Sequence, residues 1–133
     1  MKILLVDDSE ANVYLFEEAF QALHSIHELE IARDGEEALQ RLHATAGKEH
    51  LPALIVLDLN LPKVDGFEVL RAIRGDSKLR AIPVIVFSSS SHDRQVYRAY
   101  ELGANAYLVK PLDNFVDLVG DLESFWLRRA ELP

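Results

Sequence analysis

The stretch Leu54-Ile55-Val56-Leu57-Asp58 decides the fold of this chain, because four apolar residues run directly into a carboxylate. Short continuous apolar runs are typical of parallel strands that are buried on both faces. If such strands lie in one sheet, their carboxyl ends meet at one edge, where open α/β folds place their sites. Three more runs end in the same way: residues 3–6 before Asp7-Asp8, residues 84–87 before Ser88, and residues 106–109 before Lys110-Pro111.

Segments with helical spacing separate these runs. Residues 26–32 alternate between apolar and polar side chains and predict a further, more exposed strand. Asp34 is expected to cap the helix that follows, with Glu37 as its reciprocal partner. Apolar stripes predict five helices: Val13-Phe16-Phe20-Leu23, Ala38-Leu39-Leu42, Phe67-Leu70-Ile73, Val96-Ala99-Leu102 and Phe115-Leu118-Leu122-Phe125. The alternation predicts an α/β fold, a (βα)5 doubly wound parallel sheet that occupies residues 1–133 as a single domain.

Composition narrows the classes of function. The chain has 133 residues, with 14 Lys and Arg against 22 Asp and Glu, a formal net charge of −8, and no Cys. The acidic balance argues against nucleic acid or an anionic membrane as the main partner. The lack of Cys excludes disulfides, thiolate chemistry and zinc–thiolate sites. We expect a cytoplasmic protein, because we find no signal peptide and no apolar stretch of the roughly 18 residues that span a membrane.

Three carboxylates, Asp7, Asp8 and Asp58, are expected together at the sheet edge. Carboxylates forced close raise one another's pKa, and a divalent cation removes that cost. An all-oxygen set favours Mg²⁺, or Mn²⁺ in its place, over zinc. With the Lys110 ammonium and the Ser88 hydroxyl, these groups supply the parts for phosphoryl transfer to Asp58. Taken singly, each residue also fits a helix cap or a solvated loop, and the coincidence of four strand ends favours the site.

The same residues resemble the five-position signature of response-regulator receiver domains in two-component signalling. Asp7-Asp8 follows the first strand, Asp58 the third, Ser88 the fourth and Lys110-Pro111 the fifth. The loop Leu57-Asp58-Leu59-Asn60-Leu61-Pro62 is similar to the family's phosphorylation loop. The resemblance covers nearly the whole chain and implies a flavodoxin-like, CheY-like fold with strand order 2-1-3-4-5.

By this resemblance, Asp58 is the phosphoacceptor, which takes a phosphoryl group from a sensor histidine kinase in a magnesium-dependent reaction. The metal site would comprise Asp8 as a direct ligand, Asp7 through water, Asp58 itself and the backbone carbonyl of Asn60. The resemblance implies a regulator, not an enzyme, which has no output domain and signals through a protein-interaction surface. The alternative within signalling is a phosphorelay intermediate that passes phosphate to a histidine phosphotransfer protein.

The resemblance also assigns a switch. Ser88 would bond one phosphoryl oxygen and Lys110 another. The Tyr107 ring would move inward when Ser88 is drawn towards the phosphoryl group. The peptide bond before Pro111 is expected to be cis, which would aim Lys110 inward.

Further segments look like the single-domain regulators that partner bacterial phytochrome kinases: the long stretch before residues 54–57, Ala99-Tyr100-Glu101-Leu102 and the Phe125-Trp126-Leu127 ending. That subgroup forms homodimers through the face made by the fourth helix, the fifth strand and the fifth helix, which implies the same for this chain. Tyr97, Tyr100 and Trp126 are predicted to be exposed there, whereas Phe125 is predicted to lie in the core.

Two rival classes fit the residues less well. Metal-dependent phosphatases that work through an aspartyl-phosphate usually carry their nucleophile just after the first strand, with a second Asp two residues on. Here the pair Asp7-Asp8 is adjacent, and the expected acceptor follows the third strand. A flavin-binding domain of similar topology needs a hydroxyl-rich phosphate loop where Asp7-Asp8 would repel a phosphate.

Overall fold

The computed structural model describes residues 1–45 and 50–133. Its centre is a parallel sheet in the order β2-β1-β3-β4-β5, which confirms the predicted fold and strand order. The strands are β1 (Lys2–Val6), β2 (Glu28–Ala32), β3 (Leu54–Leu57), β4 (Val84–Ser88) and β5 (Ala106–Val109). The helices are α1 (Glu10–Ala22), α2 (Gly35–Ala44), α3 (Gly66–Gly75), α4 (Asp93–Glu101) and α5 (Val116–Leu122), which the π-helix η2 (Glu123–Arg129) continues.

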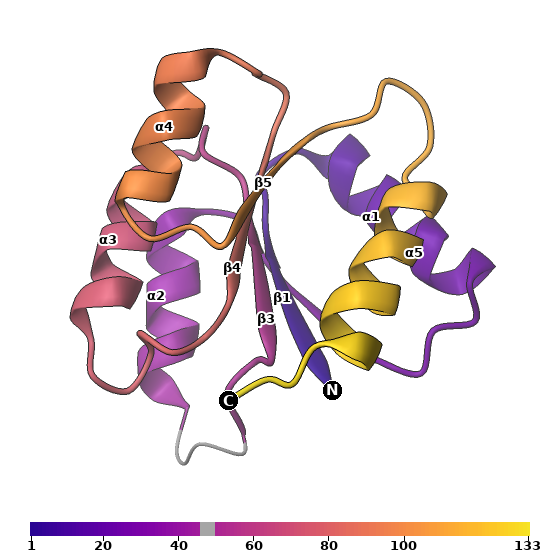
Figure 1. Ribbon diagram of the computed structural model, residues 1–133, viewed down its shortest axis with the longest axis horizontal. Coiled ribbons are helices and arrows are strands. Elements are labelled where there is room, and N and C mark those ends of the chain that lie inside the picture. Colours follow the sequence, from indigo (N-terminus) through magenta and orange to yellow (C-terminus); the bar gives the residue numbers. More distant parts are fainter. Residues whose placement is uncertain (46–49) are drawn as a thin grey trace.

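Helices cover both faces of the sheet. Figure 1 shows α1 and α5 on one face and α2, α3 and α4 on the other. Successive residues of β1 enter opposite cores, with Leu5 in the α1–α5 core and Leu4 in the other. This two-sided burial explains why residues 3–6, 54–57 and 84–87 are continuously apolar. In the described part of the chain, no helix is both long enough and apolar enough to cross a membrane.

Side-chain caps set where the helices begin beside the sheet edge. Asp34 Oδ1 accepts a hydrogen bond from the Glu37 N–H at 2.7 Å, which confirms the predicted cap. The Glu37 carboxylate reaches back one residue further than expected and accepts from the Arg33 N–H at 3.0 Å. The backbone after β2 is therefore held by α2 from its first turn.

The last turns of the chain correct the prediction for its two aromatic residues. Phe125 is 56% exposed, whereas Trp126 is half-buried against the α1–α5 core. The physical reason is the π-helix, in which the Ala130 N–H donates to the Phe125 carbonyl five residues back. The wider turn rotates the buried stripe, so Leu127 takes the core position that a regular helix would give to Phe125.

Gly66 allows α3 to begin directly against the backbone that follows β3. Its N–H donates to the Leu59 carbonyl at 3.0 Å. A Cβ on residue 66 would clash with the Asp58 carbonyl oxygen and would lie 2.5 Å from Leu59 Cα. Because both neighbours are backbone atoms beside Asp58, neither can move without displacing that residue.

We predict that Gly66→Ala lowers the free energy of unfolding by about 1–3 kcal/mol, the usual cost of forcing extra volume into a packed site. Urea unfolding followed by circular dichroism measures it. Gly75→Ala is the matched control at the other end of α3, because a Cβ there meets nothing within 4 Å. It should leave stability unchanged or raise it by up to about 1 kcal/mol. Equal effects of the two substitutions would contradict the steric argument.

Candidate functional site

The backbone hydrogen bonds of the sheet continue into the residues that follow the strands. The Asp7 N–H donates to the Ala32 carbonyl at 3.0 Å, and the Asp58 N–H donates to the last carbonyl of β1 at 2.9 Å. On the β5 side, the Lys110 N–H donates to the Ser88 carbonyl at 2.8 Å. The structure therefore brings Asp7, Asp58, Ser88 and Lys110 to one edge, as the sequence predicts.

Polar burial is concentrated at this edge. In residues 1–45 and 50–133, the polar or charged residues that are buried are Asp7 (0% exposed), Asp58 (4%) and Ser88 (0%). Buried carboxylates are costly unless they are paired and hydrogen-bonded. Two buried carboxylates and one buried hydroxyl at the ends of three different strands mark a site more strongly than any of them alone.

The Lys110 ammonium lies between the two buried carboxylates. Its Nζ is 3.1 Å from Asp7 Oδ2 and 3.1 Å from Asp58 Oδ2. The same ammonium lies 5.4 Å from the centre of the Phe87 ring, and its side chain is only 11% exposed. A single buried cation therefore offsets part of the charge of two carboxylates, and one negative charge stays uncompensated by this contact.

Burial raises the pKa of the Asp58 carboxyl above its ordinary value of 3.8. The Lys110 ammonium lowers this pKa in turn, the Asp7 carboxylate raises it, and the Asn60 N–H, 3.1 Å from Asp58 Oδ1, lowers it. The balance disfavours the ionised carboxylate, so an added cation would favour it.

Asp7 is held by two contacts from α1 and its cap. Its Oδ1 accepts from the Ser9 N–H at 2.9 Å, and its Oδ2 accepts from the Asn12 side-chain amide at 3.4 Å. The sequence analysis missed Asn12, whose only signal is its place in the first turn of the helix that Ser9 caps. These bonds fix the orientation of the Asp7 carboxylate.

The three carboxylates form a cluster with the donor atoms of a cation site. One oxygen from each of Asp7, Asp8 and Asp58 lies within 4.8 Å of the others, and Asp8 is exposed on the solvent side. An all-oxygen set that is open on one side fits Mg²⁺ or Mn²⁺, which keep waters as ligands. Asn60 is also at this edge and exposed, with its N–H bonded to Asp58.

Ser90 links the predicted switch residues, a contact that the sequence did not reveal. The Ser90 N–H donates to Ser88 Oγ at 3.2 Å, and the Ser90 carbonyl accepts from the Tyr107 hydroxyl at 2.7 Å. The Tyr107 ring is half-buried and packs on the α2–α3–α4 core. The backbone N–H of Tyr107 donates to the hydroxyl of Tyr100, a residue of α4, at 3.2 Å. A chain of contacts therefore runs from Ser88 to the surface of α4.

Comparison with known proteins decides the family. A family model described as the response regulator receiver domain matches residues 3–120. This chain is a receiver domain of the response regulator family. The strand-end residues of the site all fall inside the matched segment.

Relatives of this receiver are similar over nearly its whole length. FilR2 of Methanothrix harundinacea, a probable methanogenesis regulatory protein, is 45% identical and covers 94% of this chain and 83% of its own. The response regulator Rcp1 of Synechocystis sp. is 43% identical, over 98% of this chain and 92% of its own.

Solved structures agree with this relationship. The Mn²⁺-bound form of Rcp1 superposes with a TM-score of 0.87 at 41% identity and covers 99% of this chain and 98% of its own. The phosphorylated cyanobacterial phytochrome response regulator RcpA superposes with a TM-score of 0.90 at 40% identity, with coverages of 99% and 97%.

The predicted cis peptide bond before Pro111 is wrong. No cis peptide bond occurs within residues 1–45 and 50–133 of the receiver. The trans form is the favoured isomer even before proline, by about 0.5–1 kcal/mol. The Lys110 ammonium reaches both Asp7 and Asp58 from the trans backbone, so its inward position does not need the cis isomer.

We predict that Asp58→Asn raises the melting temperature of the metal-free receiver by a few degrees at pH 7. The raised pKa means that ionised Asp58 destabilises the fold, and the neutral amide removes this effect. The gain should shrink as the pH falls through the raised pKa and vanish below the ordinary value of 3.8. Thermal unfolding in a chelating buffer from pH 7 downwards measures it.

The exposed Asp121→Asn on α5 is the control and should change stability by no more than about 0.5 kcal/mol at any of these pH values. A metal-free Asp58→Asn protein that melts below the wild type at pH 7 would contradict the predicted sign.

Proposed function

We propose that Asp58 accepts a phosphoryl group from a phosphohistidine of a sensor histidine kinase. The bond between phosphorus and the imidazole nitrogen breaks, and a bond forms between phosphorus and an Asp58 carboxylate oxygen. The imidazole keeps the electron pair of the broken bond and is protonated from solvent. The observation that carries this proposal is the position of Asp58, at the end of the central strand β3, with Lys110 Nζ 3.1 Å from one of its oxygens.

The other residues at the edge balance the charge of the transfer. Mg²⁺, or Mn²⁺ as in the Rcp1 structure, would be held by Asp7, Asp8 and Asp58 with the Asn60 carbonyl. The metal supplies positive charge for phosphoryl oxygens. The Lys110 ammonium would pair with one phosphoryl oxygen. The phosphorylated RcpA supports this assignment through its similarity to the chain.

The contacts of Ser90 suggest how modification would reach the surface. The Ser88 hydroxyl now accepts from the Ser90 N–H and would turn to donate to a phosphoryl oxygen. Loss of the Ser88–Ser90 contact frees the loop to which the Tyr107 hydroxyl is bonded. Tyr107 and Tyr100 would then change position together, which is the switch of this receiver.

The partners follow from the relatives. RcpA is described as a phytochrome response regulator, which supports a phytochrome-type sensor kinase as the phosphodonor. We propose that the chain acts in the cytoplasm as a single receiver domain over residues 1–133 and signals by protein contact, without enzymatic turnover and without nucleic acid or membrane as a partner. The alternative of a phosphorelay intermediate is not favoured, because the relatives Rcp1 and RcpA are named response regulators.

We expect one phosphoryl group per wild-type chain after incubation with Mg²⁺ and acetyl phosphate, and none on Asp58→Asn, because the amide is not a nucleophile here. Intact-mass spectrometry measures both. Asp121→Asn, which removes an exposed carboxylate from α5, should label like the wild type. A label that persists in Asp58→Asn would refute Asp58 as the acceptor. Release of many acetates per chain without stable labelling would point to a phosphatase.

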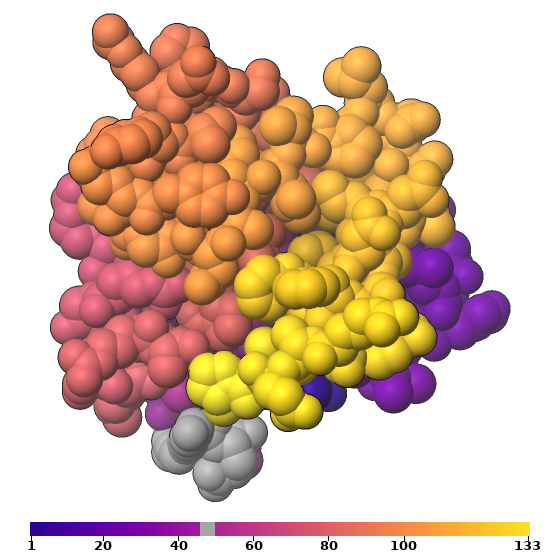
Figure 2. Space-filling model, in the orientation of Figure 1, coloured from indigo at the N-terminus to yellow at the C-terminus, as the bar shows by residue number. Residues whose placement is uncertain are grey.

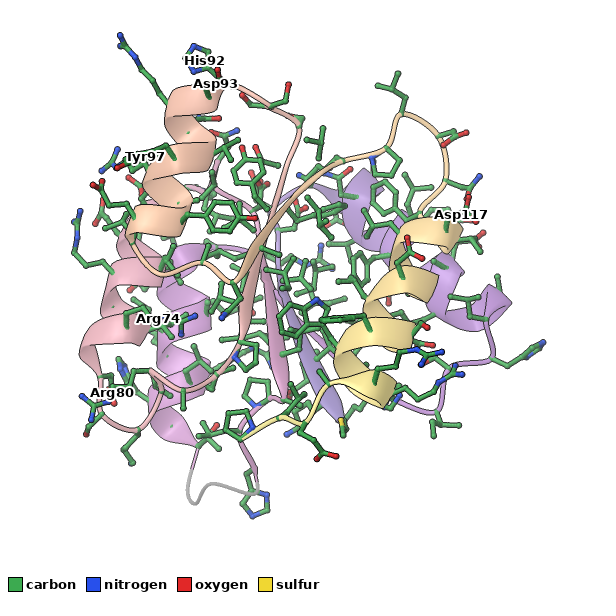
Figure 3. All side chains as sticks on the ribbon, viewed as in Figure 1. Arg74, Arg80, His92, Asp93, Tyr97 and Asp117 are labelled. Carbon is green, nitrogen blue, oxygen red and sulfur yellow. The ribbon has the colours of Figure 1, made fainter. Side chains whose placement is uncertain are left out.

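The face formed by α4, β5 and α5 with η2 carries exposed aromatic residues, and we propose it as a homodimer interface. Tyr97 is 71% exposed, Tyr100 49% and Phe125 56%. Figure 2 shows α4 and β5 in orange and α5 with η2 in yellow as one continuous surface. In Figure 3, Tyr97 on α4 and Asp117 on α5 lie on opposite sides of β5. Exposed aromatic side chains on one face are a common feature of interfaces, and a twofold axis lets one face meet its own copy.

We predict that Phe125→Ala and Tyr97→Ala shift a wild-type dimer towards monomer, because each removes exposed ring area from this face. Multi-angle light scattering after gel filtration, with and without acetyl phosphate, measures it. Tyr14→Ala is the matched control, because Tyr14 is also exposed (60%) but lies on α1. A wild type that is monomeric in both states would overturn the interface.

A further inference from the structure

A second cation, Arg33, lies at the same edge of the sheet as the carboxylates, on the β2 side, whereas Lys110 lies on the β5 side. Arg33 follows β2, and its Nη1 is 2.6 Å from Glu10 Oε1 at the start of α1. Lys110 reaches Asp58 from the β5 end of the sheet, whereas Arg33 stands at the β2 end. None of the roles proposed above uses this ion pair.

The strand register places Arg33 next to Asp7. Val6 pairs with Ala32, and the Asp7 N–H donates to the Ala32 carbonyl, so the next residue on each strand is a neighbour across the ladder. Adjacent strands lie about 4.8 Å apart. Val6 and Ala32 both face the α2–α3–α4 core, so alternation turns Asp7 and Arg33 towards α1. The contacts of Asp7 with Asn12 and of Arg33 with Glu10 agree with that direction.

Lys110 and Arg33 differ in burial and therefore in how freely their side chains can move. The Lys110 side chain is 11% exposed and holds two carboxylates, whereas Arg33 and Glu10 are 46% and 82% exposed. An exposed pair of this kind contributes little to stability, so little is lost when it opens. The Arg33 backbone is independently fixed, because its N–H donates to the Glu37 carboxylate. The Arg33 guanidinium can thus separate from Glu10 without any movement of the backbone after β2.

We propose that Arg33 is a specificity-determining residue that binds the incoming phosphoryl group of the donor, and that Glu10 restrains it until a donor arrives. The proposal rests on phosphoryl transfer to Asp58. The donor meets a rim on which Asp8 and Glu10 are exposed, in a chain of net charge −8. A guanidinium matches phosphate oxygens in a bidentate geometry and offsets this repulsion. Glu10 competes with the donor for the same guanidinium.

The test measures phosphorylation by acetyl phosphate with Mg²⁺, in which the phosphorus–oxygen bond to acetate breaks, acetate leaves with its electron pair, and phosphorus bonds to Asp58. Arg33→Gln should lower the initial slope of rate against donor concentration by about two- to fivefold, the range of one exposed charge contact. The rate extrapolated to saturating donor should not change. Arg33→Lys should restore part of the slope, and Glu10→Gln should raise it.

Arg41→Gln is the matched control. Arg41 is equally exposed (45%) and ion-paired with Glu30 and Glu37, but it lies in the last turn of α2. It changes the net charge by the same amount and should leave the slope near the wild-type value. In Arg33→Gln the slope should also depend less on added salt.

The outcomes separate this inference from the proposed function. A wild type that is not labelled on Asp58 overturns the proposed function, and this inference with it. A labelled wild type with equal slopes for Arg33→Gln and Arg41→Gln overturns the role of Arg33 alone. A fall in the saturating rate, with the initial slope reduced equally by Arg33→Lys, would show a structural role and would also overturn it.

Discussion

The contact of one ammonium with two buried carboxylates is the constraint on which the rest of this molecule depends. Asp7 and Asp58 end neighbouring strands, so the sheet itself forces their charges together away from water. Burial raises the pKa of Asp58 although the Lys110 ammonium, which contacts both carboxylates, lowers it. The compensation that is missing is what a divalent cation can supply. The same uncompensated negative charge therefore lowers the stability of the fold and favours the binding of a cation on which the proposed reaction depends.

Much of this could be predicted from sequence because two general rules govern it. Short continuous apolar runs between helices are typical of parallel strands, and the carboxyl ends of parallel strands share one edge. Those rules alone bring Asp7, Asp58, Ser88 and Lys110 together, without any knowledge of loops. Strand β5 has a continuous apolar run but lies at an edge of the sheet, and its residues are half-buried or exposed, not buried on both faces as the pattern predicts. Strand β2 lies at the other edge. Its alternating pattern predicted the strand but placed its start too early, and Ile26 is 91% exposed.

The contacts that sequence could not predict are those that loops and side-chain rotamers decide. Each of these contacts joins polar side chains or loop atoms that could equally well bond to other neighbours. Examples are Asn12 with Asp7, Ser90 with Tyr107, and Arg33 with Glu10. The peptide bond before Pro111 belongs to the same class, because the family resemblance predicted the cis isomer and the structure has the trans isomer. Residue types at strand ends are thus more predictable than the partners that orient them.

The π-helix at the end of the chain has a consequence for how this protein is compared with its relatives. A π turn closes its hydrogen bond over one more residue than an α turn. Against a relative whose last helix is regular, η2 amounts to a one-residue insertion absorbed within the helix. An alignment without a gap would then pair the side chains of η2 with the wrong positions, Phe125 among them. Differences in oligomeric specificity between such proteins can therefore arise from helix phase alone, without any change in the composition of the surface.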